Sequence, residues 1–326
     1  SRRQRQMCIR DRMKRIAGLF TTLLLLMALA SCNSPKSAGE NPFFTQWDTP
    51  FGVPPFDKIR AEHFMPAFER GMSLHDAEID AITSNNDEPT FENTILAYDN
   101  AGQMLAQTEL IFGMLCAAET NERMQALQEQ VMPLLSAHRD KIRLDEKLFA
   151  RVKDVYDRRA SLGLDAEQSR LLRKTYDAFV RSGALLDAGQ KARLKEINGE
   201  LSLTAVKFGN NILAENNNFA LELTADDLEG LPSGVRDAAR EKAQAMGKGD
   251  KWVFTLHKPS LIPFLTYSAK RDLREKIYKA YLNRCNNGDQ YDNKQLINDF
   301  IRLRTEKAKM LGYPSYAAYV LSLIHI

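Results

Sequence analysis

From Lys58 to Leu311, the apolar residues of this chain recur at intervals of three or four positions, in one segment after another. This spacing places them on one face of an α-helix, and each such face must be buried against another element. No self-similarity with a period of about 34 or 40 residues accompanies it, so a regular repeat solenoid is not expected. The sequence therefore predicts a mostly α fold built from many packed helices.

Local start and stop signals divide this region into separate helices. Thr90, with Asn93 three residues later, predicts an N-terminal cap, and Thr120 and Asp165 are further expected helix starts. Gly312, followed by Pro314, marks the end of the last one. The expected helices cover about residues 58–85, 90–116, 120–138, 144–159, 165–179, 194–218, 233–246, 259–282 and 293–311. The side chains expected to face the core include Phe64, Ala67, Phe68, Met72, Met124, Val131, Leu134, Leu135, Leu172, Phe179, Leu194 and Ile197.

Two short stretches interrupt the helical pattern. Residues 218–224 and 252–256 alternate apolar and polar positions and are rich in β-branched or aromatic residues, which favours a small antiparallel β pair. Residues 43–55 are rich in aromatic residues and proline, so we expect an extended segment on the surface of the fold.

The net charge of +3 comes from the first 31 residues, which hold seven Lys/Arg and one acid. The other 295 residues carry 38 Lys/Arg and 41 Asp/Glu. A slightly acidic body lacks the basic surface that nucleic acid requires, so no nucleic-acid partner is expected.

Residues 13–31 have the layout of a secretory signal peptide: Lys14 and Arg15, then an apolar run from residue 16 to 30. The run has 15 residues, and a bilayer-spanning helix needs about 20. The sequence LASC, ending at Cys32, resembles the lipobox of bacterial lipoproteins, in which the cysteine receives a lipid. We therefore predict lipidation of Cys32, a polar tether over residues 32–41, and a protein anchored to a membrane and facing the periplasm; which membrane stays open. The alternative is a cysteine that follows an ordinary signal peptide by chance.

Both ends of the chain resemble translated sequencing-adapter sequence. Residues 1–12 precede a sound start at Met13, and residues 321–326 read LSLIHI without a helix-ending signal. We exclude both from the prediction of the fold. The expectation is that the natural chain continues beyond residue 320 and that this is its N-terminal fragment.

Cys116 and Cys285 remain once Cys8 and Cys32 are set aside. Their spacing does not argue for a disulfide, and Cys116 is expected to be a buried small hydrophobic residue.

The five histidines show no metal-binding spacing, and the zinc motif H-E-x-x-H is absent. His75 and Glu78 would share a helical face, which we interpret as a solvated pair. His63 is expected on a helix surface or half-buried, and His138 at a helix C-terminus, where a cation is favoured. His257 follows a predicted strand, where contact with a substrate is the alternative to a loop residue, and His325 lies in the excluded C-terminal residues.

No nucleotide-binding loop and no hydrolase nucleophile motif is present in the sequence. The charge-rich stretches 236–242 and 271–279 are typical of exposed helix faces with ion pairs four residues apart. The residues alone therefore predict an exported, α-rich protein without a visible active site.

Six segments, in order along residues 41–319, resemble the thimet oligopeptidase and oligopeptidase A family of zinc metallopeptidases, in its peptidyl-dipeptidase (dipeptidyl carboxypeptidase) branch. They are NPFF at 41–44, FDKIRAEHFMPAFERGM at 56–72, FENTILAYDNAGQML at 91–105, LFARVKDVYDRRASLGLDAEQSRLL at 148–172, REKIYKAYLNR at 274–284 and LRTEKAKMLGYPSYAAY at 303–319. Each segment alone is a weak signal, whereas the ordered set is strong. Within the set, SLGLDAEQSRLL favours the peptidyl-dipeptidase branch.

The resemblance implies the N-terminal half of an enzyme in which two helical halves flank a channel for short unfolded peptides. It implies one zinc ion, held by H-E-x-x-H and a further glutamate on the C-terminal side, where zinc activates water. No residue of this chain matches those ligands, so the resemblance assigns no catalytic and no metal residue here. It further implies a monomer that hydrolyses oligopeptides, with release of C-terminal dipeptides expected and internal cleavage left open. One wall of the channel would be formed by this chain, which by itself would be inactive.

Two functions remain open. One is the N-terminal part of a zinc peptidyl-dipeptidase, and the other is a non-catalytic helical lipoprotein that binds peptides. The native reading frame discriminates between them, because only the enzyme requires H-E-x-x-H downstream.

Overall fold

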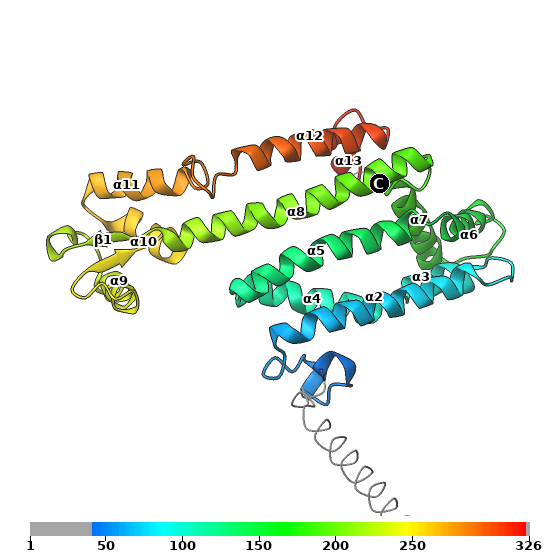
Figure 1. Cartoon of the computed structure of the whole chain (residues 1–326), viewed down its shortest axis with the longest axis horizontal. Helices are drawn as coiled ribbons and strands as arrows, with labels where there is room; N and C mark the ends of the chain where they lie inside the picture. Colours follow the sequence, from blue (N-terminus) through cyan, green and yellow to red (C-terminus); the bar gives the residue numbers. More distant parts are fainter. Residues whose placement is uncertain (1–40, 324–326) are drawn as a thin grey trace, which may run out of the picture. The chain divides into compact units, whose positions relative to one another are not determined.

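The computed structural model describes residues 41–323, and their fold is mostly α, as predicted (Figure 1). The signal peptide, Cys32, the tether up to residue 40 and His325 lie outside the described residues. The chain divides into two compact units, one that ends at His63 and one that begins at Phe64.

The first unit, as far as it is described, contains two short 3-10 helices, η1 (Pro42–Phe44) and η2 (Pro50–Gly52). Trp47 donates from Nε1 to the carbonyl oxygen of Pro42 at 2.7 Å, and its ring meets that of Phe43 edge-on. Phe43 is buried, whereas Phe51 is fully exposed. The prediction of an extended surface segment is therefore wrong for η1, η2 and Phe43, because local carbonyl contacts turn the backbone and bury one ring.

Helices make up most of the second unit, with two short strands. The elements are α2 (Ala61–Thr83), which begins in the first unit, η3 (Phe91–Leu96, a π-helix), α3 (Ala97–Asp99), α4 (Gln103–Ala118), α5 (Glu122–Arg143), α6 (Glu146–Asp157), α7 (Ala166–Arg181), α8 (Ala188–Asn218), β1 (Leu221–Leu223), η4 (Ala225–Asp227), α9 (Ser233–Ala245), β2 (Trp252–Phe254), α10 (Lys258–Tyr267), α11 (Arg271–Leu282), α12 (Lys294–Met310) and α13 (Tyr316–Leu321).

Side-chain caps begin the helices at the positions where the sequence carries the right residue. Thr90 accepts from the backbone N–H of Asn93 at 3.1 Å, and the Asn93 side chain accepts from Thr90 N, which completes a capping box. Asp165 and Gln168 form the same motif at α7. The start of α5 is a correction, because Asn121 rather than Thr120 caps it, through its bond from Met124 N.

The helix expected over residues 90–116 is broken at Gly102, which adopts a left-handed conformation with φ of +75°. Its backbone N–H donates to Glu78 Oε2 of α2 at 2.7 Å, which a continuous helix would not permit. Further along the same pair of helices, a Cβ on Gly71 would lie 3.0 Å from the Cα of Leu105. Glycine at this position therefore lets α2 and α4 approach closely.

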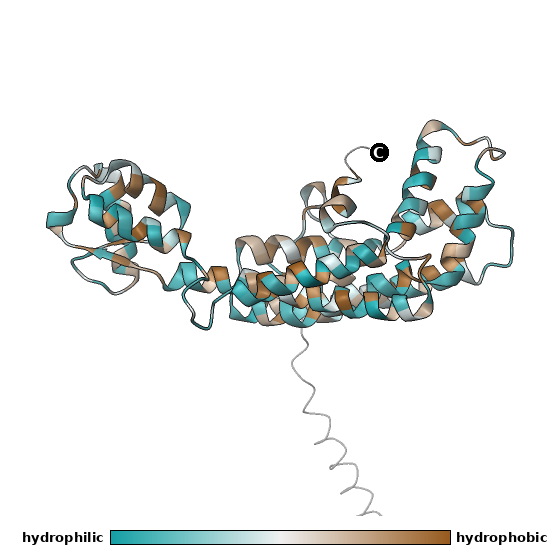
Figure 2. Cartoon of the chain, turned by 90° about the horizontal axis from the view of Figure 1, so that it is seen from above, coloured by the Kyte–Doolittle hydropathy of each residue, from teal (hydrophilic) through white to brown (hydrophobic). Residues whose placement is uncertain are grey.

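The 31-residue helix α8 packs against α5 and against α12, as Figure 1 shows. In Figure 2, hydrophilic and hydrophobic residues alternate along the helices, as expected where each helix buries one face. Val131, Leu135, Leu194 and Ile197 are buried as predicted, whereas Leu134 is exposed, so its predicted inward position is wrong.

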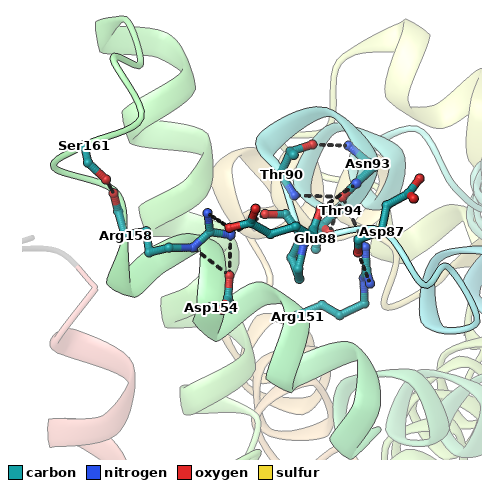
Figure 3. Close-up of polar contacts among 10 residues, drawn as sticks. Asp87, Glu88, Thr90, Asn93, Thr94, Arg151, Asp154, Arg158 and Ser161 are labelled. Carbon is teal, nitrogen blue, oxygen red and sulfur yellow. Dashed lines mark hydrogen bonds and ion pairs between the residues drawn. The ribbon is translucent and has the colours of Figure 1, made fainter.

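One apolar core joins the end of α2, η3, α5, α6 and α7. Phe179 is fully buried in it, with ring centroids of Tyr98 and Phe149 at 5.3 and 6.0 Å. Arg151 of α6 and Arg158, which directly follows α6, fasten the loop before η3 onto this core (Figure 3). Arg151 donates to the carbonyl oxygen of Asn85 at 2.7 Å, and Arg158 pairs with Glu88 at 2.6 Å.

A second core lies under the predicted β pair, which the structure confirms. β1 and β2 are antiparallel, with Leu221 opposite Phe254. Leu223, Phe254, Phe264 and Ile277 are buried together with side chains of α9, α10 and α11. Helix α9 lies between the two strands in the sequence, as predicted. The helix expected over residues 259–282 is instead two helices, α10 and α11, with a break at Ser268.

Within residues 41–323, none of the helices combines the length and the apolar composition that a membrane span requires.

Replacing Phe179 with alanine should lower the free energy of unfolding by about 3–5 kcal/mol, because it empties a fully buried aromatic site. Phe51→Ala is the matched control, since Phe51 is fully exposed, and should change stability by less than about 0.5 kcal/mol. Urea unfolding followed by circular dichroism measures both, and equal effects would contradict the assignment of the core.

Candidate functional site

A cavity of 1460 Å³ is lined by residues of α2, α4, α5, α7, α8, α12 and α13, together with the short segment around Tyr98. Seven Lys or Arg, three Asp or Glu, two histidines and two tyrosines lie on its walls. Peptide and small-molecule sites are commonly concave surfaces with a few convergent polar groups. This cavity is therefore the candidate functional site of the described residues.

A polar cluster on the cavity wall connects three helices, α5, α8 and α12. Asn198 donates from Nδ2 to Asp140 Oδ1 at 2.8 Å, and Lys307 donates from Nζ to Asn198 Oδ1 at 2.6 Å. Burial raises the pKa of Asp140 and lowers that of Lys307, because each charge has lost water. Oδ2 of Asp140 is buried and has no hydrogen-bond partner among the described residues. Buried unsatisfied polar atoms of this kind are uncommon and mark the cluster as a feature that needs a role.

Two histidines from α2 and α5 meet at the same cavity. Nε2 of His138 lies 3.1 Å from Nδ1 of His75, so one ring donates and the other accepts. Burial lowers the pKa of both rings; His138 also lowers that of His75, whereas Asp76 and Glu109 act in the opposite direction on both. The pair is therefore favoured in its neutral form.

The structure corrects two histidine predictions. His138 does not end a helix, because α5 continues to Arg143, and its side chain is buried. His75 and Glu78 do not form a solvated pair, since His75 bonds His138 and Glu78 bonds the backbone of Gly102. Neither contact is visible in the spacing of residues along α2, because both partners come from other helices.

The described residues do not fit the zinc that the resemblance implies. Among residues 41–323, no three His, Cys, Asp or Glu side chains gather so that they could hold a metal. The two facing nitrogens of His75 and His138 are engaged with each other, and the neighbouring Asp76 pairs with Lys141 at 2.8 Å.

The other predicted residues lie away from the cavity lining. His63 is half-buried, as expected, and its Nδ1 accepts from Arg60 N at 3.0 Å. His257 is exposed before α10 and contacts Thr255 Oγ1 at 3.3 Å. Both described cysteines are free thiols; Cys116 is only half-buried, which corrects the prediction, whereas Cys285 is buried. Burial raises the pKa of each thiol to about 11, so both remain protonated at neutral pH.

The chain is similar in sequence to known peptidases. Residues 264–324 match the model of Peptidase family M3. The chain is 36% identical over 280 residues, or 86% of its length, to the dipeptidyl carboxypeptidase of Escherichia coli (strain K12). It is 35% identical over 282 residues to the dipeptidyl carboxypeptidase of Salmonella typhimurium, and 27% identical over 274 residues to oligopeptidase A of Escherichia coli.

These similarities define the class: the chain is related to the peptidases of family M3, and the resemblance given by the six sequence segments is confirmed. Within that class, identity is higher to the two dipeptidyl carboxypeptidases than to oligopeptidase A, in line with the predicted branch. The chain spans about two fifths of the length of these relatives, 41% of each dipeptidyl carboxypeptidase.

Sequence reasoning considered His75 and His138 but missed the cations that line the same cavity. Arg170, Arg173 and Lys174 follow one another at the spacing of a single helical face, and this was a readable signal. Arg143 and Arg181 gave no such signal, because each stands at the end of its helix, where a cation has an ordinary structural role.

The His75–His138 pair should make stability depend on pH. The folded chain holds both pKa values below the ordinary 6.5, so protons bind more tightly to the unfolded chain. The stability contributed by the neutral pair is therefore complete above about pH 6.5 and is lost as the pH falls towards the folded pKa values. Asp76, Glu78 and Glu109 oppose this loss, whereas Arg139 and Lys141 favour it.

Denaturant unfolding at pH 7.5 and pH 5.5 measures this dependence. His138→Gln should reduce the difference between the two pH values, and the exposed His257→Gln should leave it unchanged. A wild-type difference that persists in full in His138→Gln would contradict the assignment to this pair.

Proposed function

We propose that this chain is the N-terminal part of a zinc-dependent peptidyl-dipeptidase that removes C-terminal dipeptides from oligopeptides, and that its cavity forms one wall of the substrate channel. The observation that carries the proposal is the similarity to two dipeptidyl carboxypeptidases over 86% of the chain. The match of residues 264–324 to Peptidase family M3 also supports it.

The chemistry of the cavity supports a peptide as its ligand. Its volume of 1460 Å³ exceeds the roughly 300–1,000 Å³ of ordinary small-molecule pockets and can hold several residues of an extended chain. Leu105, Leu110 and Leu201 supply apolar lining for side chains. Ser136, Ser202 and the polar cluster provide donors and acceptors of the kind that satisfy a peptide backbone.

Catalysis in this proposal requires residues that the described part of the chain does not supply. The zinc ligands and the catalytic base would come from sequence beyond this chain, consistent with its span of 41% of the dipeptidyl carboxypeptidases. The role of the described residues is to bind and orient the peptide.

The protein expressed from the native locus should carry H-E-x-x-H downstream of this sequence and release dipeptides from the C-terminus of a blocked tetrapeptide. Mass spectrometry of the products detects the release. A zinc chelator should abolish it and added zinc should restore it, because zinc is expected to activate the attacking water. A stop codon directly after this sequence, with peptide binding but no hydrolysis, would instead establish the non-catalytic lipoprotein.

The isolated chain of 326 residues provides the matching control. It should bind no stoichiometric zinc in native mass spectrometry, since no three His, Cys, Asp or Glu side chains of the described residues lie close enough together to hold a metal ion. One tightly bound zinc per chain would contradict the placement of the metal site outside this sequence.

We propose, in addition, that Cys32 is lipidated and anchors the protein to a membrane with its folded part in the periplasm. The support is the apolar run from residue 16 to 30, followed by the LASC motif.

Metabolic labelling with an alkyne fatty acid in a bacterial host tests the anchor. Wild type and Cys116→Ser should incorporate the label and sediment with membranes, whereas Cys32→Ser should do neither. Label retained in Cys32→Ser would rule out this residue as the attachment site.

A further inference from the structure

Five cations line the cavity without an acidic partner among the described residues, and we call them the basic wall: Arg143, Arg170, Arg173, Lys174 and Arg181. The other two cations of the lining are already matched. Arg139 pairs with Glu109 at 2.7 Å, and Lys307 belongs to the polar cluster with Asp140. Asp177 is the remaining acid, so the unmatched charge of the cavity is strongly positive.

Arg143 is held in place by aromatic rings instead of by acids. Its guanidinium carbon lies 5.7 Å from the ring centroid of Tyr98 and 5.5 Å from that of Phe179. Burial raises the pKa of Tyr98, so the phenol stays neutral and leaves the arginine charge uncompensated. Cation–π contacts of this kind orient an arginine while its charge stays available to a ligand.

Arg181, the last residue of α7, is also held without an acid, here by tyrosines near the C-terminal end of the described residues. It donates to Tyr313 Oη at 3.0 Å and to the carbonyl oxygen of Tyr319 at 2.6 Å. None of these acceptors is a carboxylate. The guanidinium carbon also lies 4.5 Å from the centroid of the Tyr319 ring, and burial raises the pKa of that phenol, so the ring stays neutral. A side chain that is already ordered loses little further entropy when a ligand binds.

Arg170, Arg173 and Lys174 lie on one face of α7, at spacings of three and four residues, and all three are exposed. No hydrogen bond or ion pair ties them to any described residue, and Asp177, on the same helix, forms no ion pair with them. Like charges at this spacing destabilise a helix slightly. A ligand of opposite charge would relieve that repulsion.

We propose that the basic wall binds carboxylates of the peptide, so that oligopeptides rich in Asp and Glu are the preferred ligands of this cavity. This inference rests on the proposed function for the peptide nature of the ligand. A nucleic acid, the other common polyanion, is disfavoured because the chain beyond residue 31 is net acidic and the cations are confined to a cavity.

Fluorescence anisotropy with labelled octapeptides tests the proposal on the purified chain, in which binding is measured without hydrolysis. A peptide with three internal Glu should bind about tenfold more tightly than the same peptide with Gln, and high salt should remove the difference. Amidation of the C-terminus separates the two sources of carboxylate and should weaken binding less than the exchange of Glu for Gln. Dipeptide release by the protein from the native locus is a separate measurement, so failure of one inference does not imply failure of the other.

The triple variant Arg170→Ser, Arg173→Ser, Lys174→Ser should bind the Glu peptide about tenfold more weakly, as expected for the loss of three exposed charge pairs. The control variant Arg236→Ser, Lys242→Ser, Lys276→Ser removes the same charge from exposed positions outside the lining and should bind within about twofold of wild type. Arg170→Lys with Arg173→Lys should retain binding, because the charge is kept.

Three results would overturn the proposal. They are equal affinity for the Glu and Gln peptides, equal loss in the control triple variant, and binding of a short oligothymidylate as tight as that of the acidic peptide.

Discussion

The packing of α8 against α5 and α12 is the constraint on which the rest of the second unit depends. A helix of 31 residues spans about 46 Å, so a single element can line the cavity and also reach the loop after α11, where Glu215 accepts from the backbone N–H of Cys285. Asn198 stands where α8 meets both neighbours, and its amide bonds Asp140 on one side and Lys307 on the other. The apolar side chains hold the helices together, and polar contacts fix their register: this amide beside the cavity, and elsewhere pairs such as Arg193 with Glu306 of α12.

The sequence predicted the helices well because their determinants are local. Thr90 and Asp165 cap their helices through backbone groups three residues away, so the residue types at those positions suffice. The β pair was also predicted, although its strands are 28 residues apart at their facing ends, because each strand carries its own alternating pattern. The prediction that Thr120 caps α5 was wrong, and the reason is also local: the next residue, Asn121, is the stronger N-cap.

The candidate site could not be predicted because its contacts join residues far apart in the chain. His75 and His138 are separated by 63 positions, and Arg181 reaches Tyr319, which is 138 positions further on. Periodicity identifies a helical face but does not identify the helix that it meets. Glu78 is an example of such an unpredicted contact. It bonds Gly102, where the helix expected over residues 90–116 is broken, and it is therefore not the partner of His75 that the sequence suggested.

The distribution of charge separates what holds this fold together from what the cavity can bind. Elsewhere, ion pairs join some of the cations to acids. Glu275 with Lys279 on α11 is a pair four residues apart of the kind predicted for residues 271–279, whereas residues 236–242 form no such pair among the described residues. At the cavity, Arg143 and Arg181 are ordered by neutral rings and carbonyl groups instead. Stability alone would be served equally well by an acid at either place, since a carboxylate orients an arginine at least as firmly as a ring does. Aromatic and neutral partners have a different consequence: they hold the guanidinium groups still and leave their charge for a ligand.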